Sequence, residues 1–135
     1  MRRCEGPPAT VGDLMTEDLL AILPEDRVGR ARDVMLSVGV HAVLVMDGNE
    51  VLGIVTSTDL IDNWPDDEPI ATAMTVAPAA ISVEATVREA AESMISTRTH
   101  HLLVEDGHEV IGILSSFDLL DALTVAAELA GDIGV

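Results

Sequence analysis

Two spacings of apolar residues alternate along the chain, and together they predict a mixed α+β fold. Val28, Ala31 and Met35 recur every three or four residues, as on one face of a helix. Ala42–Met46 and Val51–Val55 are unbroken apolar runs of strand length. Because these runs lack polar alternation, we expect the sheet that contains them to be covered on both faces.

Turn and cap signals give the order of the elements. Asp26 precedes the helix and is predicted to cap it. Asp47-Gly48, between the two apolar runs, is a hairpin signal. A short strand around Leu20–Leu23 precedes the helix, and a second helix is expected to begin near Asp59. The predicted order is therefore β-α-β-β-α.

This pattern occurs twice. Met15-Thr16 returns 59 residues later as Met74-Thr75, and the offset holds without a gap from Val11 to Asp62, with 22 of 52 positions identical. The second copy repeats the same features: strands at 79–83, 102–104 and 110–114, a Thr86–Glu89 capping box, an Asp106-Gly107 turn, and a closing helix from Asp118 toward Leu129. Two copies are too few for a solenoid, so we expect them to pack as a pseudo-two-fold pair.

The repeat also sets the expected domain boundaries. Two prolines and three acidic residues mark a linker between the copies. The expected segments are a flexible tail at 1–9, repeat 1 at 10–63, the linker at 64–69, repeat 2 at 70–125, and a helix end and tail at 126–135.

Composition and charge narrow the range of possible functions. The net charge is −17 and all seven cations are arginines, so P-loop and Schiff-base lysine chemistries are excluded. The acidity disfavours binding to nucleic acid or anionic membranes. Cys4 is the only cysteine, which excludes an intrachain disulfide. No apolar run approaches the roughly 20 residues of a membrane span, and the amino terminus does not resemble a signal peptide, so we expect a cytoplasmic protein.

The acidic surface raises one further hypothesis, adaptation to a salt-rich cytoplasm. High net charge keeps a protein soluble but makes the compact state repel itself. A free energy of unfolding that rises in molar KCl would support this hypothesis, and indifference to salt would count against it.

One motif in each copy carries candidate chemistry. A strand ends in a hydroxyl residue, Thr56 or Ser115, and an aspartate, Asp59 or Asp118, follows three positions later. Capping of the next helix explains either motif alone. A carboxylate at this place can also accept hydrogen bonds from two vicinal hydroxyls, such as those of ribose, and a helix amino terminus beside it suits a phosphate.

With these motifs in order, residues 10–125 resemble a tandem pair of cystathionine-β-synthase (CBS) domains, the Bateman module. The Gly-Ile-Val-Thr-x-x-Asp signature, the helix Ala and Met, and the Asp-Gly turn carry the resemblance. It implies a non-enzymatic sensor that binds AMP, ADP, ATP or S-adenosylmethionine in clefts between the repeats, with no catalytic cofactor.

Carried onto this sequence, the resemblance gives roles to particular residues. Asp59 and Asp118 would bind ribose hydroxyls, with Thr56, Thr58 and Ser115 beside the ribose or phosphate. Each cleft would combine both repeats: the adenine would lie near Ala31 and Val51 in the cleft of Asp118, and near Ala90 and Val110 in the cleft of Asp59. A plain core role for these four apolar residues stays open. Leu44 and Leu103 depart from the family, which often has proline there.

Phosphate contacts are less well defined by the sequence. Phe117 stands where phosphate binders often have a polar or basic residue. The remaining candidates are Arg27, Arg30, Arg32, Arg88, Arg98, His41 and His100, with solvated surface as the alternative for the arginines. Adjacent histidines on a strand point to opposite faces, so a metal site is not expected. The net charge favours a ligand with few negative charges, such as AMP, adenosine or S-adenosylmethionine, over ATP.

The sequence therefore predicts a stand-alone regulatory module. We expect a homodimer, because the helices leave apolar faces uncovered, and an unidentified protein that responds to the bound ligand. The alternative is a protein-interaction scaffold whose clefts no longer bind ligand. An enzyme is the third reading, and the sequence contains no Gly-x-Ser-x-Gly elbow or comparable arrangement to support it.

Overall fold

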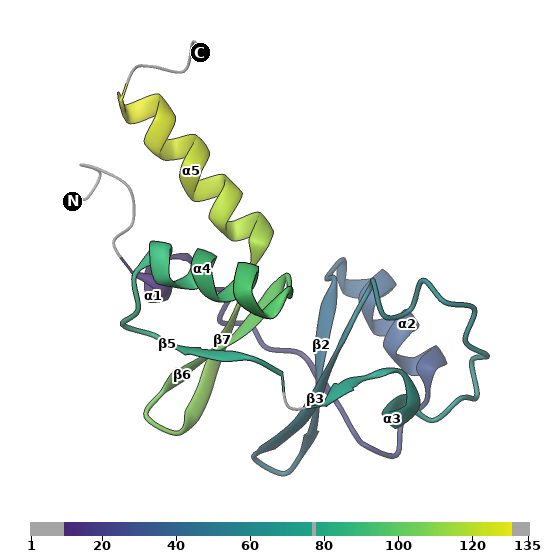
Figure 1. Ribbon diagram of the computed structural model, residues 1–135. Coiled ribbons are helices and arrows are strands. Elements are labelled where there is room, and N and C mark those ends of the chain that lie inside the picture. Colours follow the sequence, from purple (N-terminus) through teal and green to yellow (C-terminus); the bar gives the residue numbers. More distant parts are fainter. Residues whose placement is uncertain (1–9, 77, 131–135) are drawn as a thin grey trace. The chain divides into compact units, whose positions relative to one another are not determined.

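The computed structural model describes residues 10–76 and 78–130 (Figure 1). These residues form two compact units, which we call the central unit, Leu19–Pro78, and the terminal unit, made of the residues up to Asp18 and those from Ala79 onward. The units do not follow the sequence repeat, because the segment that opens each repeat packs with the other repeat's sheet.

The central unit is built on a four-stranded sheet of order β1-β2-β3-β4. Strand β1 is parallel to β2, and β2 and β3 form an antiparallel hairpin that β4 extends. The parallel pair requires a crossover, which the helix between β1 and β2 supplies. The elements of this unit are β1 (Ala21–Ile22), α2 (Val28–Val38), β2 (Ala42–Asp47), β3 (Glu50–Thr56), α3 (Ile70–Ala73) and β4 (Thr75–Val76).

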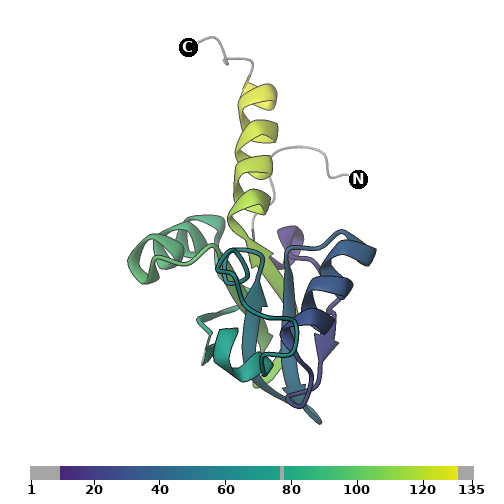
Figure 2. The same ribbon diagram turned by 90° about the vertical axis from the view of Figure 1, so that its right-hand side faces the viewer.

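The terminal unit repeats this arrangement with a three-stranded sheet, β5-β6-β7. An isolated bridge between Thr16 and Ile113 stands where β4 stands in the central unit. Its last helix leaves the end of β7 and extends away from the sheet, diverging from α4 (Figures 1 and 2). The elements are α1 (Val11–Leu14), β5 (Ala80–Ser82), α4 (Val87–Thr97), β6 (His101–Asp106), β7 (Glu109–Ser115) and α5 (Ser116–Ala130).

Each unit has its own aliphatic core. In the central unit Val28, Ala31 and Met35 of α2 are buried against the sheet, as the helical spacing predicts. In the terminal unit Ala90 and Met94 of α4 occupy the equivalent places. No charged or polar side chain is buried among the described residues, so both cores are held by apolar contact alone.

The two Met-Thr segments explain a glycine in each repeat. A Cβ on Gly53 would lie 2.7 Å from the Thr75 carbonyl oxygen and 2.9 Å from Met74 Sδ. A Cβ on Gly112 would lie 2.6 Å from Met15 Sδ. The chain therefore passes so close to β3 and β7 that only glycine fits beneath it.

The amino terminus of α2 differs from the prediction. Arg27 is the N-cap, without a side-chain cap, so the assignment of Asp26 as the cap is wrong. The Asp26 carboxylate accepts the Leu23 N–H at 2.8 Å and closes the preceding turn instead. The first helical amides, of Val28 and Gly29, donate to carbonyls of the linker, each at 2.9 Å. The linker thus satisfies donors that otherwise need a capping side chain.

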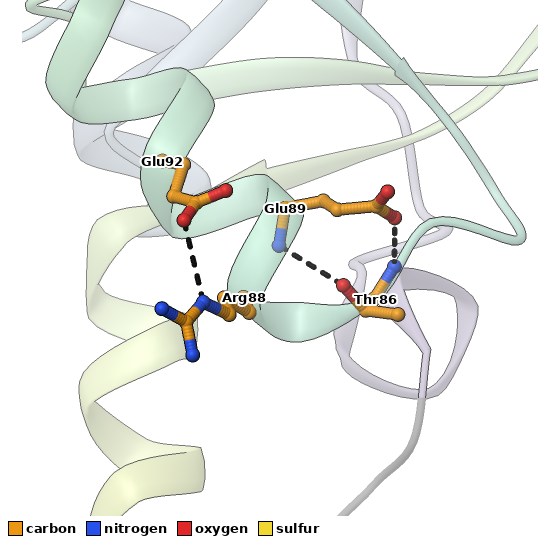
Figure 3. Close-up of polar contacts among 4 residues, drawn as sticks. All are labelled: Thr86, Arg88, Glu89 and Glu92. Atoms are coloured by element: carbon orange, nitrogen blue, oxygen red, sulfur yellow. Dashed lines mark hydrogen bonds and ion pairs between the residues drawn. The ribbon is translucent and has the colours of Figure 1, made fainter.

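The capping box of α4 is confirmed (Figure 3). Thr86 Oγ1 accepts the Glu89 N–H at 3.0 Å, and the Glu89 carboxylate accepts the Thr86 N–H at 2.9 Å. Two amides of the first turn are therefore paired by side chains of the helix itself.

The closing helix forms in only one repeat. Helix α5 follows β7 as predicted, but residues 57–60 after β3 form turns, so the helix expected near Asp59 is wrong. The Trp64 indole N–H donates to the Asp59 carbonyl at 3.1 Å, occupying an acceptor that a helix would use. Pro65 follows and disfavours helical backbone at the residue before it. Eight residues, about two helical turns, lie between the strand and this proline.

Arg98 ends α4 in a left-handed conformation, with φ 58°, whereas the equivalent residue after α2 is Gly39, with φ 81°. A side chain in this region is strained, and glycine is not. We therefore expect Arg98→Gly to raise the free energy of unfolding by about 0.5–1 kcal/mol in urea titrations. Thr97→Gly, inside the helix, should lower it by about 1 kcal/mol. Equal losses for both variants would contradict this account of Arg98.

Candidate functional site

The motif aspartates lie at the corner where the last strand of each hairpin ends. The Thr56 N–H donates to Asp59 Oδ2 at 2.9 Å, and the Asp59 N–H donates to Thr56 Oγ1 at 3.2 Å. In the terminal unit the Ser115 N–H donates to Asp118 Oδ2 at 2.8 Å, and the Asp118 N–H donates to Ser115 Oγ at 3.1 Å. The same reciprocal pair therefore forms before a turn and before a helix.

This pairing includes the capping role that either motif alone would predict. It also leaves one oxygen of each carboxylate available to accept further hydrogen bonds. In both corners Oδ2 accepts the backbone N–H, and Ser115 Oγ donates a further bond to Asp118 Oδ2 at 3.0 Å. Among the described residues no protein group donates a hydrogen bond to Oδ1 of either aspartate, and both side chains are half-buried. A fixed carboxylate with a free oxygen can accept hydrogen bonds from ligand hydroxyls.

The predicted adenine residues are one core alanine and one strand valine in each unit. Ala31 and Ala90 have no exposed surface and belong to the two cores. Val51 and Val110 are half-buried and lie five residues before the corner of their own strand, about 16 Å away along it. Neither valine is therefore within reach of the aspartate of its own unit, and the roles of these four residues stay a prediction.

Three of the candidate arginines have partners. The Arg27 guanidinium donates to the Asp67 carbonyl at 3.0 Å, and Arg32 pairs with Asp66 at 2.7 Å, so both hold the linker against α2. Arg88 pairs with Glu92 one turn along α4 at 3.3 Å (Figure 3). Both partners of this last pair are exposed, so it contributes little to stability.

The other candidates are exposed. Thr58 lies in the turn after β3, and His41 lies at the start of the hairpin in the central unit. His100, its equivalent, has Nδ1 at 3.4 Å from Ser116 Oγ, and Arg98 lies two residues before it. Ser116 was not among the predicted site residues. Its helical spacing with Leu119, Leu120 and Leu123 could have indicated the shared face.

Two kinds of feature are absent from the described part of the chain. No group of three or more His, Cys, Asp or Glu side chains there could hold a metal ion. None of its helices is both long and apolar enough to cross a bilayer.

Comparison with known proteins identifies both repeats. The CBS-domain family profile matches residues 11–66 and 70–125. YlbB of Bacillus subtilis is 32% identical over 116 residues, which cover 81% of this chain and 78% of YlbB. The inosine-5'-monophosphate dehydrogenase of Korarchaeum cryptofilum is 29% identical over 103 residues, which cover 76% of this chain but only 22% of the dehydrogenase.

Solved structures show the same fold. A CBS-domain containing protein from Agrobacterium tumefaciens superposes with a TM-score of 0.80 at 26% identity, over 91% of this chain and 99% of that one. The CBSX2 protein, solved in complex with AMP, superposes with a TM-score of 0.73 at 23% identity, over 87% and 97% of the two chains. With both repeats matched by the profile, the chain belongs to the CBS-domain family and carries two CBS domains in tandem.

Proposed function

We propose that this chain is a cytoplasmic regulatory module that binds an adenosine-containing ligand and passes the bound state to a partner protein. The ribose hydroxyls are bound by Asp59 and Asp118, with Thr56 and Ser115 beside the sugar. The observation that carries the proposal is the carboxylate held at each corner by a backbone N–H, with Oδ1 left for a ligand.

The two repeats support the proposal independently. The corner geometry recurs although a turn follows Asp59 and a helix follows Asp118. A carboxylate needed only to cap a helix has no helix to cap in the central unit. The AMP complex of CBSX2 shows that a protein of this fold binds such a ligand.

The charge of the chain favours a weakly charged ligand. A net charge of −17 repels polyanions, and Arg27, Arg32 and Arg88 are paired within the protein. AMP, adenosine and S-adenosylmethionine carry fewer negative charges than ATP, so we expect them to bind more tightly.

We also propose that the module is a homodimer. Leu36 on α2 and Ile61 after β3 are 83% and 78% exposed, although both are large and aliphatic. Where exposed apolar residues of this size form one patch, the patch marks a contact surface. A second copy covering them would remove apolar surface from water on both chains.

The alternative proposal is an interaction scaffold without a ligand. The burial of Ala31 and Ala90 and the pairing of three arginines favour it, because they leave fewer side chains for adenine and phosphate. The same exposed apolar residues would then serve the partner protein.

A thermal-shift panel separates the two proposals. The nucleotide-stripped chain is heated with AMP, ADP, ATP, S-adenosylmethionine and, as a control, guanosine monophosphate. Ligand at a hundred times its Kd stabilises the native state by about 2.7 kcal/mol, so we expect a saturable rise in Tm with at least one adenosyl compound and a smaller rise with the guanosine control. An unchanged Tm with every adenosyl compound, in a stable dimer, would favour the scaffold.

A further inference from the structure

The first turn of α5 carries the only phenylalanine of the chain, Phe117, directly before Asp118. Its side chain is 75% exposed, although a buried aromatic ring would contribute more to stability than most side chains. The chain has no tyrosine, and its one tryptophan, Trp64, packs against the core of the central unit. Phe117 is therefore the one phenyl or indole ring that the protein leaves in water.

Neither apolar surface of the terminal unit uses this ring. Phe117 does not belong to the core cluster of the described residues. The face between α4 and α5 is lined by Ile95 and Leu120, among others, and these are the repeat-2 equivalents of Leu36 and Ile61 in the proposed dimer contact. Phe117 does not line that face, so a second copy that covers it need not cover the ring.

The corner before α5 offers few groups to a phosphate. The N–H groups of Ser115, Ser116 and Asp118 donate to Asp118 Oδ2, to the His100 carbonyl and to Ser115 Oγ, at 2.8, 2.8 and 3.1 Å. Three of the four amides that a helix start exposes are therefore taken by the protein. The first turn also holds the Asp118 carboxylate and no arginine or lysine. A phosphate at this turn would meet a negative charge and at most one open amide.

We propose that Phe117 makes the Asp118 corner selective for an adenosyl sulfonium, a nucleoside with a positively charged sulfur on its 5′ carbon, as in S-adenosylmethionine. The inference rests on the proposed function, from which it takes the ribose bound by Asp118. The face of a phenyl ring attracts a cation that lies within about 6 Å of its centre. A ribose held through its 2′ and 3′ hydroxyls carries the 5′ substituent across one five-membered ring, so the side chain next to the carboxylate can reach it.

The corner favours this ligand over two related classes. A 5′-phosphate is repelled by the carboxylate and finds few donors. A neutral thioether nucleoside would contact the ring but would not be attracted by its quadrupole. The net charge of −17 favours any cation, but at physiological salt it is screened beyond about 8 Å, whereas the ring acts at contact. Thr58 stands in place of Phe117 in repeat 1, so the Asp59 corner lacks this preference.

The test compares S-adenosylmethionine with S-adenosylhomocysteine, which lacks only the sulfonium methyl group and its charge. Both are titrated by calorimetry into the full chain carrying Asp59→Ala, so that the Asp118 corner alone is read. Molar KCl screens the net charge beyond about 3 Å. We expect the sulfonium to bind about fivefold more tightly than the thioether.

Two variants in the same background assign this preference to the ring. Phe117→Leu keeps an exposed apolar side chain and should lower the affinity ratio below twofold, while the thioether and AMP stay within twofold of their earlier affinities. Phe117→Tyr keeps an aromatic face and should keep the ratio near fivefold. Because the position is exposed, circular dichroism should show both variants folded as the parent is.

Three results would overturn the proposal. Equal affinities of the Asp59→Ala chain for the two ligands would show that the corner does not recognise the sulfonium. A ratio that Phe117→Leu leaves unchanged would show that the preference comes from another group. Both results leave the proposed function standing if AMP binds and Asp118→Ala weakens it. Failure of every adenosyl compound to bind the wild type would instead refute the proposed function, and this inference with it.

Discussion

Gly53→Val is expected to unfold the central unit at temperatures where the wild type is stable. A Cβ at this position meets a backbone oxygen at 2.7 Å, and backbone cannot rotate away as a side chain can. The pairing of β3 with β4 would have to open, and overpacking in a tight site costs typically about 1–3 kcal/mol, with more for a branched residue. Urea titration followed by circular dichroism measures the loss.

A second glycine provides the matched control. Gly48, in the β2–β3 hairpin loop, has φ 62° and open space around its Cα, so Gly48→Ala should cost only the strain of a left-handed alanine, about 1 kcal/mol. If Gly53→Ala, a milder change than valine, costs no more than Gly48→Ala, the close approach of Thr75 to β3 is not what requires glycine.

Asp118→Ala is expected to remove the nucleotide site of its corner. The carboxylate would bind two ribose hydroxyls, and hydrogen bonds to a charged group contribute about 1.5–3 kcal/mol each, so AMP should bind at least about 100-fold more weakly there. Stability should fall by only about 1 kcal/mol, since the lost protein contact is a cap. Calorimetric titration with AMP measures the affinity, and urea titration measures the stability.

Asp121→Ala is the matched control, because it removes the same charge from an exposed position of α5. It should leave AMP binding within twofold. The Asp59→Ala/Asp118→Ala double variant should bind no AMP. AMP binding at wild-type affinity by a folded double variant would refute the role of these carboxylates.

Local patterns predicted the elements whose causes lie within a few residues. The spacing of Val28, Ala31 and Met35 predicted the buried face of α2, and Thr86 and Glu89 predicted a capping box that the structure contains. The signals for a helix near Asp59 were also local. Trp64 and Pro65, which follow it in the chain, prevent this helix: the Trp64 indole N–H occupies the Asp59 carbonyl, and Pro65 disfavours helical backbone before it. The spacing of apolar residues does not reveal that a side chain takes a backbone carbonyl that a helix would use.

Features that depend on contacts between distant segments could not be predicted from the sequence. Asp26 has the residue type of a cap, yet the α2 amides are satisfied by linker carbonyls about forty residues away along the chain. The exchange of Met-Thr segments between repeats is likewise a long-range contact. In the candidate site, the residue types predicted that Thr56 and Asp59 bond to free backbone amides, whereas their reciprocal pairing, and the pairing of Arg27 and Arg32 with the linker, required the fold.

Titration of the ¹⁵N-labelled, nucleotide-stripped protein with AMP, followed by amide chemical shifts, locates the ligand most directly. A bound ribose alters the carboxylates that accept the amides of Thr56 and Ser115. The largest shifts should therefore fall on these amides and those of Asp59 and Asp118, and should saturate together. A folded spectrum that AMP leaves unchanged, or shifts confined to other residues, would contradict the proposal that these corners bind the nucleoside.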